Sequence, residues 1–131
     1  MIGIIRNAMK TPDGTILESR HRHDFKSYKD ANGKEYFIDG GHSYLRRSAW
    51  DDQADLSVSL MDGHDRVRSA LQWGTYGVTG DTPLTYLTLK DMDTDHIETI
   101  LELQNPVASF KEAFKNEISY RKATGQWQAT I

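Results

Sequence analysis

The sequence predicts an α+β fold, in which a small antiparallel β-hairpin unit is followed by a β-α-loop-β-α-α segment. Short β-branched or alternating runs fill residues 2–38, as expected of half-buried strands. Residues 94–104 and 107–123 instead repeat their apolar side chains at helical intervals. The stretch GTYGVTGDTP at 74–83 has three glycines in ten residues and predicts a long loop between a helix and a strand.

The first strands follow from local patterns. Residues 2–9, IGIIRNAM, begin with β-branched side chains and predict a strand. TPDGT predicts a turn, because Pro12 and Gly14 both suit one. TILES at 15–19 then predicts a second strand, and the alternation of DFKSYKD at 24–30 predicts a third.

The clearest hairpin signal is DANGKEYFID. Asn32 and Gly33 both tolerate positive φ, so they predict a two-residue type I′ turn. In the strand that follows, Tyr36 and Ile38 should share one face and Phe37 should lie on the other.

Beyond the hairpin the pattern changes twice. Gly40 and Gly41 end the strand, and Ser43 is placed to cap one or two helical turns over 44–47. The alternation of residues 56–60 then predicts another strand.

The rest of the chain predicts three helices and one strand. We expect Asp62 to cap a helix over 63–73 with Gly74 as its C′ residue, and residues 84–92 to form a strand after the loop. Asp93 or Thr94 should cap the next helix. The last helix should begin at Pro106 and end at Gly125, with an apolar stripe of Val107, Phe110, Phe114 and Ile118.

Length and charge indicate one compact domain with two parts. These are a small β unit at 1–50 and an α+β lobe at 51–131. The first holds nine Lys or Arg and six Asp or Glu, a charge of +3, and the second holds seven and thirteen, a charge of −6. The basic excess is well below that of a dedicated duplex-DNA-binding domain.

Composition also restricts the cellular compartment and the kinds of site that we expect for this chain. Cysteine is absent, so disulfides and thiolate zinc sites are excluded. No apolar run is long enough to span a bilayer, and MIGIIRNAMK is too short and too soon charged for a secretory signal. We therefore expect a cytoplasmic protein with no membrane contact, no metal and no cofactor.

The part most typical of a functional site is a polar corner, formed by residues 18–25 (ESRHRHDF) and 38–47 (IDGGHSYLRR). Hairpin pairing should bring residues 23–25 opposite 38–40. Three interpretations of this corner are open.

The first interpretation is a metal site. His21 and His23 would share a strand face, because residues i and i+2 do so, and could reach one ion. No spaced motif such as HExxH supports it. The remaining candidate ligands are Asp24, Asp39 and His42.

The second interpretation is an anion site for a nucleotide, a cyclic oligonucleotide or single-stranded RNA. Gly40 and Gly41 ahead of a helical turn would expose backbone N–H groups to a negative charge. Tyr44 or Phe37 could stack on a base. Guanidinium donors would come from Arg20, Arg22, Arg46 and Arg47.

The third interpretation is a structural latch. In it His23 hydrogen-bonds Asp39, and Arg46 pairs with Asp24. A nuclease that uses a metal or the histidines as acid and base is a further alternative, but the sequence places no nucleophile and no second base.

A second candidate surface is aromatic. Trp73, Tyr76 and Tyr86 surround the Gly-rich loop, and Trp127 lies in the C-terminal GQWQATI. Trp and Tyr dominate the anchors of protein interfaces. If these side chains are exposed, they predict a docking patch for a protein.

Two stretches of the chain resemble small bacteriophage accessory proteins. The first reads Glu-Ser, His-Asp-Phe and Ile-Asp-Gly-Gly-His-x-Tyr-Leu-Arg-Arg, at 18–19, 23–25 and 38–47. The second is WGTYGVTGDTPLTYLTLKDMDTDHIETIL at 73–101. The resemblance implies a phage-encoded, non-enzymatic protein of the host bacterial cytoplasm. It would modulate or inhibit a host system, such as antiviral defence, through contact with a host protein.

Relatives of this kind look like zinc ribbons, with C-x-x-C before the Glu-Ser and C-x-C before the Asp-Gly-Gly. Here those places hold Lys10, Asp13, Asp30 and Asn32. Lysine and asparagine cannot replace thiolates around zinc. The resemblance therefore implies that this chain keeps the hairpins without a structural metal.

Overall fold

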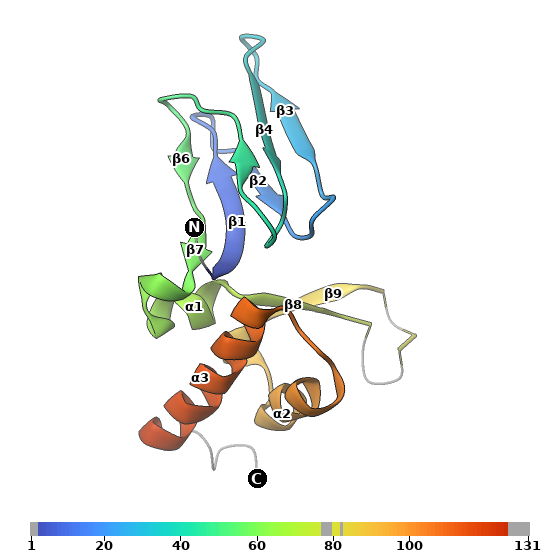
Figure 1. Ribbon diagram of the computed structural model, residues 1–131. Helices are drawn as coiled ribbons and strands as arrows, with labels where there is room; N and C mark the ends of the chain where they lie inside the picture. The colour runs from blue at the N-terminus through green and yellow to red at the C-terminus, as the bar shows by residue number, and fades with distance from the viewer. Residues whose placement is uncertain (1–2, 77–79, 82, 126–131) are drawn as a thin grey trace. The chain divides into compact units, whose positions relative to one another are not determined.

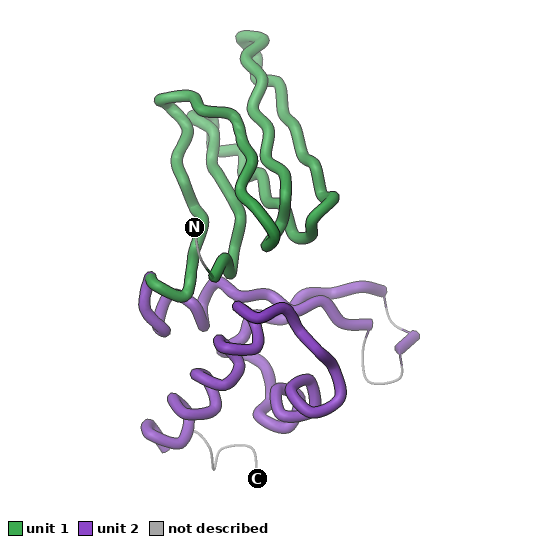
Figure 2. Tube along the Cα trace, viewed as in Figure 1, with its two compact units in different colours: residues 1–61 green, residues 62–131 purple. Residues whose placement is uncertain are grey.

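The computed structural model describes residues 3–76, 80–81 and 83–125. The chain divides into two compact units, residues 1–61 and 62–131 (Figure 2). Antiparallel strands make up unit 1, whereas helices and one hairpin make up unit 2 (Figure 1). The predicted α+β class, which begins with a β-hairpin, is confirmed.

Unit 1 is built from short strands in two sheets. The strands are β1 (Ile4–Lys10), β2 (Ile16–Ser19), β3 (Lys26–Lys29), β4 (Glu35–Asp39), β5 (Arg46–Arg47), β6 (Ala54–Asp55) and β7 (Val58–Ser59). β1 pairs with β2 along one edge and with β6 and β7 along the other. β4 lies between β3 and β5. β6 and β7 lie in the part of the sequence predicted to form the second lobe, but they pair with β1 in unit 1.

The core of unit 1 joins its two sheets. Met9 and Leu17 from the first sheet and Tyr36 and Ile38 from the second form one buried cluster, against which Tyr28 packs. Full burial of a side chain such as Met, Leu or Ile contributes about 1.5–3 kcal/mol. Tyr36 and Ile38 do share the inner face of β4, as the alternation of the sequence predicts.

The turn of the β3–β4 hairpin differs from the prediction. Gly33 N donates to Asp30 O and Asp30 N donates to Lys34 O, both at 3.0 Å. Gly33 has φ +81°, and no described residue other than glycine has positive φ. The predicted type I′ turn is therefore wrong, since a type I turn followed by a left-handed glycine joins the strands. The Asp30 carboxylate selects this form by accepting hydrogen bonds from Asn32 N and Lys34 N.

The helical turns predicted over 44–47 are also wrong. Arg46 and Arg47 instead form β5 and pair with Asp39 and Ile38 of β4. The chain reverses at a tight turn in which Ser43 N donates to Gly40 O at 3.0 Å. Cross-strand pairing thus overrides the weak capping signal at this point.

In unit 2, α3 (Ala108–Thr124) packs against one face of a two-stranded hairpin. The other elements of the unit are α1 (His64–Ala70), β8 (Gln72–Thr75), β9 (Thr85–Thr88) and α2 (Thr94–Leu103), with a 3-10 turn at Leu89–Asp91. A further 3-10 turn, Leu60–Asp62, spans the boundary between the units. The buried apolar side chains of α2 and α3 include Ile97, Ile100, Phe110 and Phe114. Among the described residues, no helix combines the length and the hydrophobicity needed to cross a membrane.

Three predicted helix boundaries in unit 2 need correction. Gly63, not Asp62, is the N-cap of α1. The helix ends at Ala70 because Leu71 is extended, and Gly74 lies inside β8, opposite Tyr86. Val107 precedes α3 as an exposed N-cap and so contributes nothing to its buried stripe.

Candidate functional site

The two segments of the polar corner do come together in unit 1. Lys26 pairs with Ile38, so the end of segment 18–25 lies beside the start of segment 38–47. Gly41 packs against His21 so closely that a Cβ on the glycine would lie 2.3 Å from the His21 carbonyl carbon. Glycine is therefore required where the segments meet.

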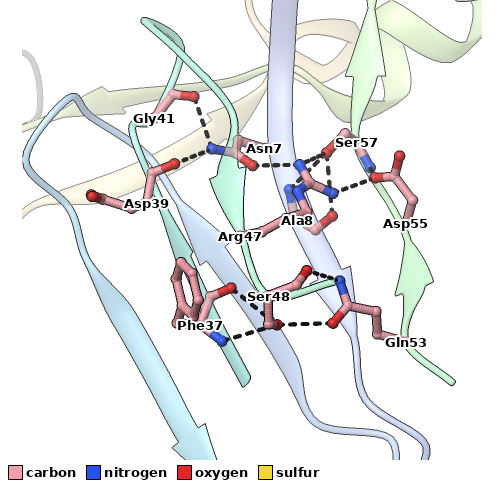
Figure 3. Close-up of polar contacts among 10 residues, drawn as sticks. All are labelled: Asn7, Ala8, Phe37, Asp39, Gly41, Arg47, Ser48, Gln53, Asp55 and Ser57. Carbon is pink, nitrogen blue, oxygen red and sulfur yellow. Dashed lines mark hydrogen bonds and ion pairs between the residues drawn. The ribbon is translucent and has the colours of Figure 1, made fainter. Parts of the chain in front are cut away.

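The centre of this corner is a residue outside both segments, Asn7 of β1 (Figure 3). Its side chain is fully buried and donates from Nδ2 to Asp39 O at 2.9 Å and Gly41 O at 3.1 Å. Its Oδ1 accepts a hydrogen bond of 2.8 Å from Arg47 Nη2. The amide thus uses its donor and acceptor ends at once and bonds to two buried backbone carbonyls.

Arg47 extends this network to the edge of β1 that pairs with β6 and β7. Its guanidinium donates to Ser57 Oγ at 2.8 Å and pairs with Asp55 Oδ1 at 2.7 Å (Figure 3). One side chain therefore connects β5, β1 and the β6–β7 segment. We call Asn7, Arg47 and their partners the polar brace.

Ser19 fixes the other side of the corner. Its hydroxyl donates to Asp24 O at 2.6 Å and accepts from Gly41 N at 2.8 Å. The Asp24 carboxylate accepts from Arg20 N at 2.8 Å and pairs with Lys26. Partial burial raises the pKa of Asp24, but the Arg20 hydrogen bond and the Lys26 charge outweigh it and lower the pKa overall.

A latch is therefore present, but its members differ from the predicted pairs. Asp39 Oδ2 is approached by Tyr44 OH at 3.5 Å and by Arg46 Nη1 at 3.8 Å, and His23 is exposed. Asp24 pairs with Lys26 and not with Arg46.

The predicted anion site at Gly40 and Gly41 has neither of its backbone N–H donors available to a ligand. Gly40 N donates to Asp39 Oδ1 at 2.9 Å and Gly41 N donates to Ser19 Oγ. No helix begins at this point, because Arg46 and Arg47 are in β5. Both backbone groups are already bonded and buried, so they offer nothing to a phosphate.

The histidines of the corner do not act together. His21, Arg22 and His23 are exposed on a turn, whereas burial lowers the pKa of His42 and favours its neutral form. Within the residues that the structure describes, no three His, Cys, Asp or Glu side chains gather as they would to hold a metal ion.

The sequence resemblance would place zinc-ribbon cysteines at Asp13 and Asp30, and both of these carboxylates accept hydrogen bonds within turns. The Asp13 carboxylate accepts hydrogen bonds from Thr11 Oγ1 and from Tyr28 OH, which ties the β1–β2 turn to β3. These hydrogen bonds hold the pKa of Asp13 well below its usual range. Asp30 organises the second turn, as described above.

The aromatic residues of unit 2 separate onto two faces of the β8–β9 hairpin. Trp73 lies opposite Leu87 and packs its ring on Phe110 and Phe114, at centroid distances of 6.3 and 5.5 Å. Tyr86 pairs with Gly74 on the other face and is 42% exposed. Tyr76 and Leu84 are 57% and 46% exposed. Trp127 lies outside the described residues. We call Tyr76, Leu84 and Tyr86 the ribbon face.

Unit 2 also buries a carboxylate that the sequence analysis missed. Glu117 is fully buried and lies 2.9 Å from Arg68 Nη2, 2.7 Å from Arg121 Nε and 2.8 Å from His64 Nε2. Burial raises the pKa of Glu117, but the hydrogen bonds from these three groups outweigh it and lower the pKa. Arg121 Nη1 also donates to Thr94 Oγ1 at 2.8 Å. This ion cluster holds α1, α2 and α3 together.

Comparison with protein-family models, with curated proteins and with solved structures found no match to this chain. Its function is therefore inferred from its own residues and their geometry.

Proposed function

We propose that this chain acts by binding a partner protein, and that the ribbon face is its contact surface. The observation that carries the proposal is the sorting of aromatic residues on the β8–β9 hairpin. Trp73 anchors one face on α3, Leu84 and Tyr86 lie exposed around Gly74 on the other, and Tyr76 is exposed just beyond the end of β8. Tyrosine supplies a large apolar contact area together with a polar hydroxyl, and interfaces are enriched in it.

The anchoring on α3 supports this proposal in a second way. A face held in place by Trp73 loses little conformational entropy on binding, so more of the contact energy appears as affinity. Gly74 contributes as well, because Leu84 and Tyr86 approach the position of its missing Cβ to 3.2 Å. A larger residue there would displace both side chains.

The resemblance to phage accessory proteins supports a host protein as the partner, a component of antiviral defence included. Residues 62–131 hold seven Lys or Arg and ten Asp or Glu. We therefore propose an apolar patch with a basic rim on the partner, since charges of opposite sign speed association and select the correct partner.

The test is affinity capture from a bacterial lysate with the full tagged chain. The double variant Tyr76→Ala/Tyr86→Ala should no longer capture the partner, whereas Phe25→Ala, which removes a comparably exposed ring from unit 1, should capture it normally. With the purified partner, loss of one anchor worth about 2 kcal/mol weakens binding roughly 30-fold. Equal capture by the double variant and the wild-type chain would refute the proposal.

A further inference from the structure

We propose that unit 1 carries a stacking site for a nucleobase, presented by single-stranded nucleic acid or by a free nucleotide. The site is a shallow groove of about 380 Å³ on the outer face of the β3–β4–β5 sheet. It is independent of the ribbon face. The residues that line it are Glu35, Phe37, Ser48, Ala49 and Trp50.

Trp50 is a fixed wall of this groove. Its indole Nε1 donates to Glu35 O at 2.7 Å, yet the residue stays 45% exposed. Lys34 Nζ lies 4.4 Å from the centroid of the Trp50 ring and pairs with Asp52 at 2.9 Å. A hydrogen bond at its edge and a cation against it orient the indole before any ligand arrives.

Phe37 forms the other aromatic wall and belongs to a longer strip of rings. Phe25 stacks on Phe37 with centroids 5.9 Å apart and planes 21° apart. The Arg46 guanidinium carbon lies 5.7 Å from the Phe37 centroid, and the side chain is 66% exposed. Aromatic faces beside accessible guanidinium groups are the combination that holds unpaired bases and their phosphates.

The cations beside the rings favour this ligand over a protein. Residues 1–61 hold nine Lys or Arg and nine Asp or Glu, so the attraction to a phosphate is local and not a property of the whole unit. It comes from Arg46, whose side chain is 66% exposed beside Phe37, and from Lys34 against Trp50. A duplex keeps its bases stacked inside and offers no free face, so the ligand must be single-stranded or mononucleotide.

A second set of hydrogen bonds, centred on Ser48, gives the site its geometry. Ser48 Oγ accepts from Phe37 N at 3.2 Å and lies 2.8 Å from Gln53 Oε1, and Gln53 Nε2 donates to Ser48 O at 2.6 Å (Figure 3). These contacts keep the segment that carries Trp50 beside β4. These hydrogen bonds therefore fix where the two rings lie along the groove.

The experiment is a titration of the full chain at low salt with a short fluorescent single-stranded RNA, the same sequence as DNA, the matching duplex, and AMP as the mononucleotide. The single strands should bind more tightly than the duplex. Trp50→Ala should weaken that binding about 5- to 150-fold, which is the loss expected of one stacked base. Trp50→Phe should retain much of it, and Tyr76→Ala should change nothing.

A second readout keeps the result interpretable if Trp50→Ala unfolds. The indole N–H resonance of Trp50, assigned from Trp50→Phe, should shift on titration of the wild-type chain, whereas that of Trp73 should not. Binding of AMP alone would identify a free nucleotide as the source of the base. Absence of saturable binding, unchanged affinity in a folded Trp50→Ala chain, or displacement of the Trp50 resonance only by a peptide would overturn the proposal.

Discussion

Both units contain a buried polar network, but the group at the centre of each network is chemically different. In unit 1 the buried group is a neutral amide, Asn7, which bonds to backbone carbonyls and to one guanidinium. In unit 2 it is a carboxylate, Glu117, surrounded by two arginines and a histidine. An amide keeps its hydrogen bonds at any pH, whereas a buried carboxylate is stable only as long as its cations remain.

The difference extends to the surface. In unit 1 the rings of the exposed Trp50 and the half-buried Phe37 lie next to cations, Lys34 and Arg46. Those of the ribbon face, Tyr76 and Tyr86, lie in a unit with more acidic than basic residues. This difference in electrostatic surroundings is the reason why we propose different ligands for the two sets of aromatic residues.

The largest expected effect comes from removing the anion of unit 2. Glu117→Ala leaves Arg121, whose side chain is 6% exposed, without its charge partner. Breaking a buried ion pair in this way costs about 3–5 kcal/mol, so urea unfolding should shift to a much lower midpoint. Glu112→Ala, on the exposed side of the same helix, is the control and should stay within about 0.5 kcal/mol of the wild type.

Removing the amide of unit 1 should have a smaller effect. Asn7→Ala takes the amide donor from the buried Asp39 and Gly41 carbonyls and one of two acceptors from Arg47 Nη2, which predicts a loss of about 1–3 kcal/mol. The exposed Asn116→Ala is the matched control. The loss should be the same at pH 5 and pH 8, since no titrating group is removed. If Asn7→Ala lowered the free energy of unfolding as much as Glu117→Ala does, the proposed difference between the two buried networks would be contradicted.

The pH dependence sharpens the contrast further. The folded-state pKa of Glu117 is lowered, so its contribution is present above the unfolded pKa and is lost as the pH falls through the folded value. Protection of the α3 amides from hydrogen exchange should therefore weaken below about pH 5. In Glu117→Gln this part of the dependence should be missing. An identical pH profile in both chains would contradict the assignment.

Individual strands and helices could be predicted from the sequence, but the contacts between residues distant in the sequence could not. Alternation placed Tyr36 and Ile38 on one face of β4, and spacing placed Phe110 and Phe114 on one face of α3. The turn at Asp30 was misassigned because its carboxylate favours a different turn from the one that Asn-Gly prefers. Asn-Gly and the Asp30 carboxylate favour different turns, and the prediction followed the weaker of the two signals.

The networks were missed for a different reason. His64 and Arg68 are spaced i, i+4, as are Glu117 and Arg121, so each pair is visible in the sequence as one helix face. The two pairs meet, however, through a contact between His64 and Glu117, which lie 53 positions apart in the sequence. The same holds for Asn7 and Arg47, which are 40 positions apart. Nothing in the run IIRNAMK marks its asparagine as the centre of the polar corner.

The central claim is that the chain has two separate binding faces, and one crossed experiment tests it most directly. Wild-type chain, Tyr76→Ala/Tyr86→Ala and Trp50→Ala would each be titrated with the captured protein partner and with single-stranded RNA. The two faces predict that the tyrosine variant loses only the protein and that the tryptophan variant loses only the RNA. If either variant lost both ligands while folded, or if neither lost its own, the claim of two faces would be contradicted.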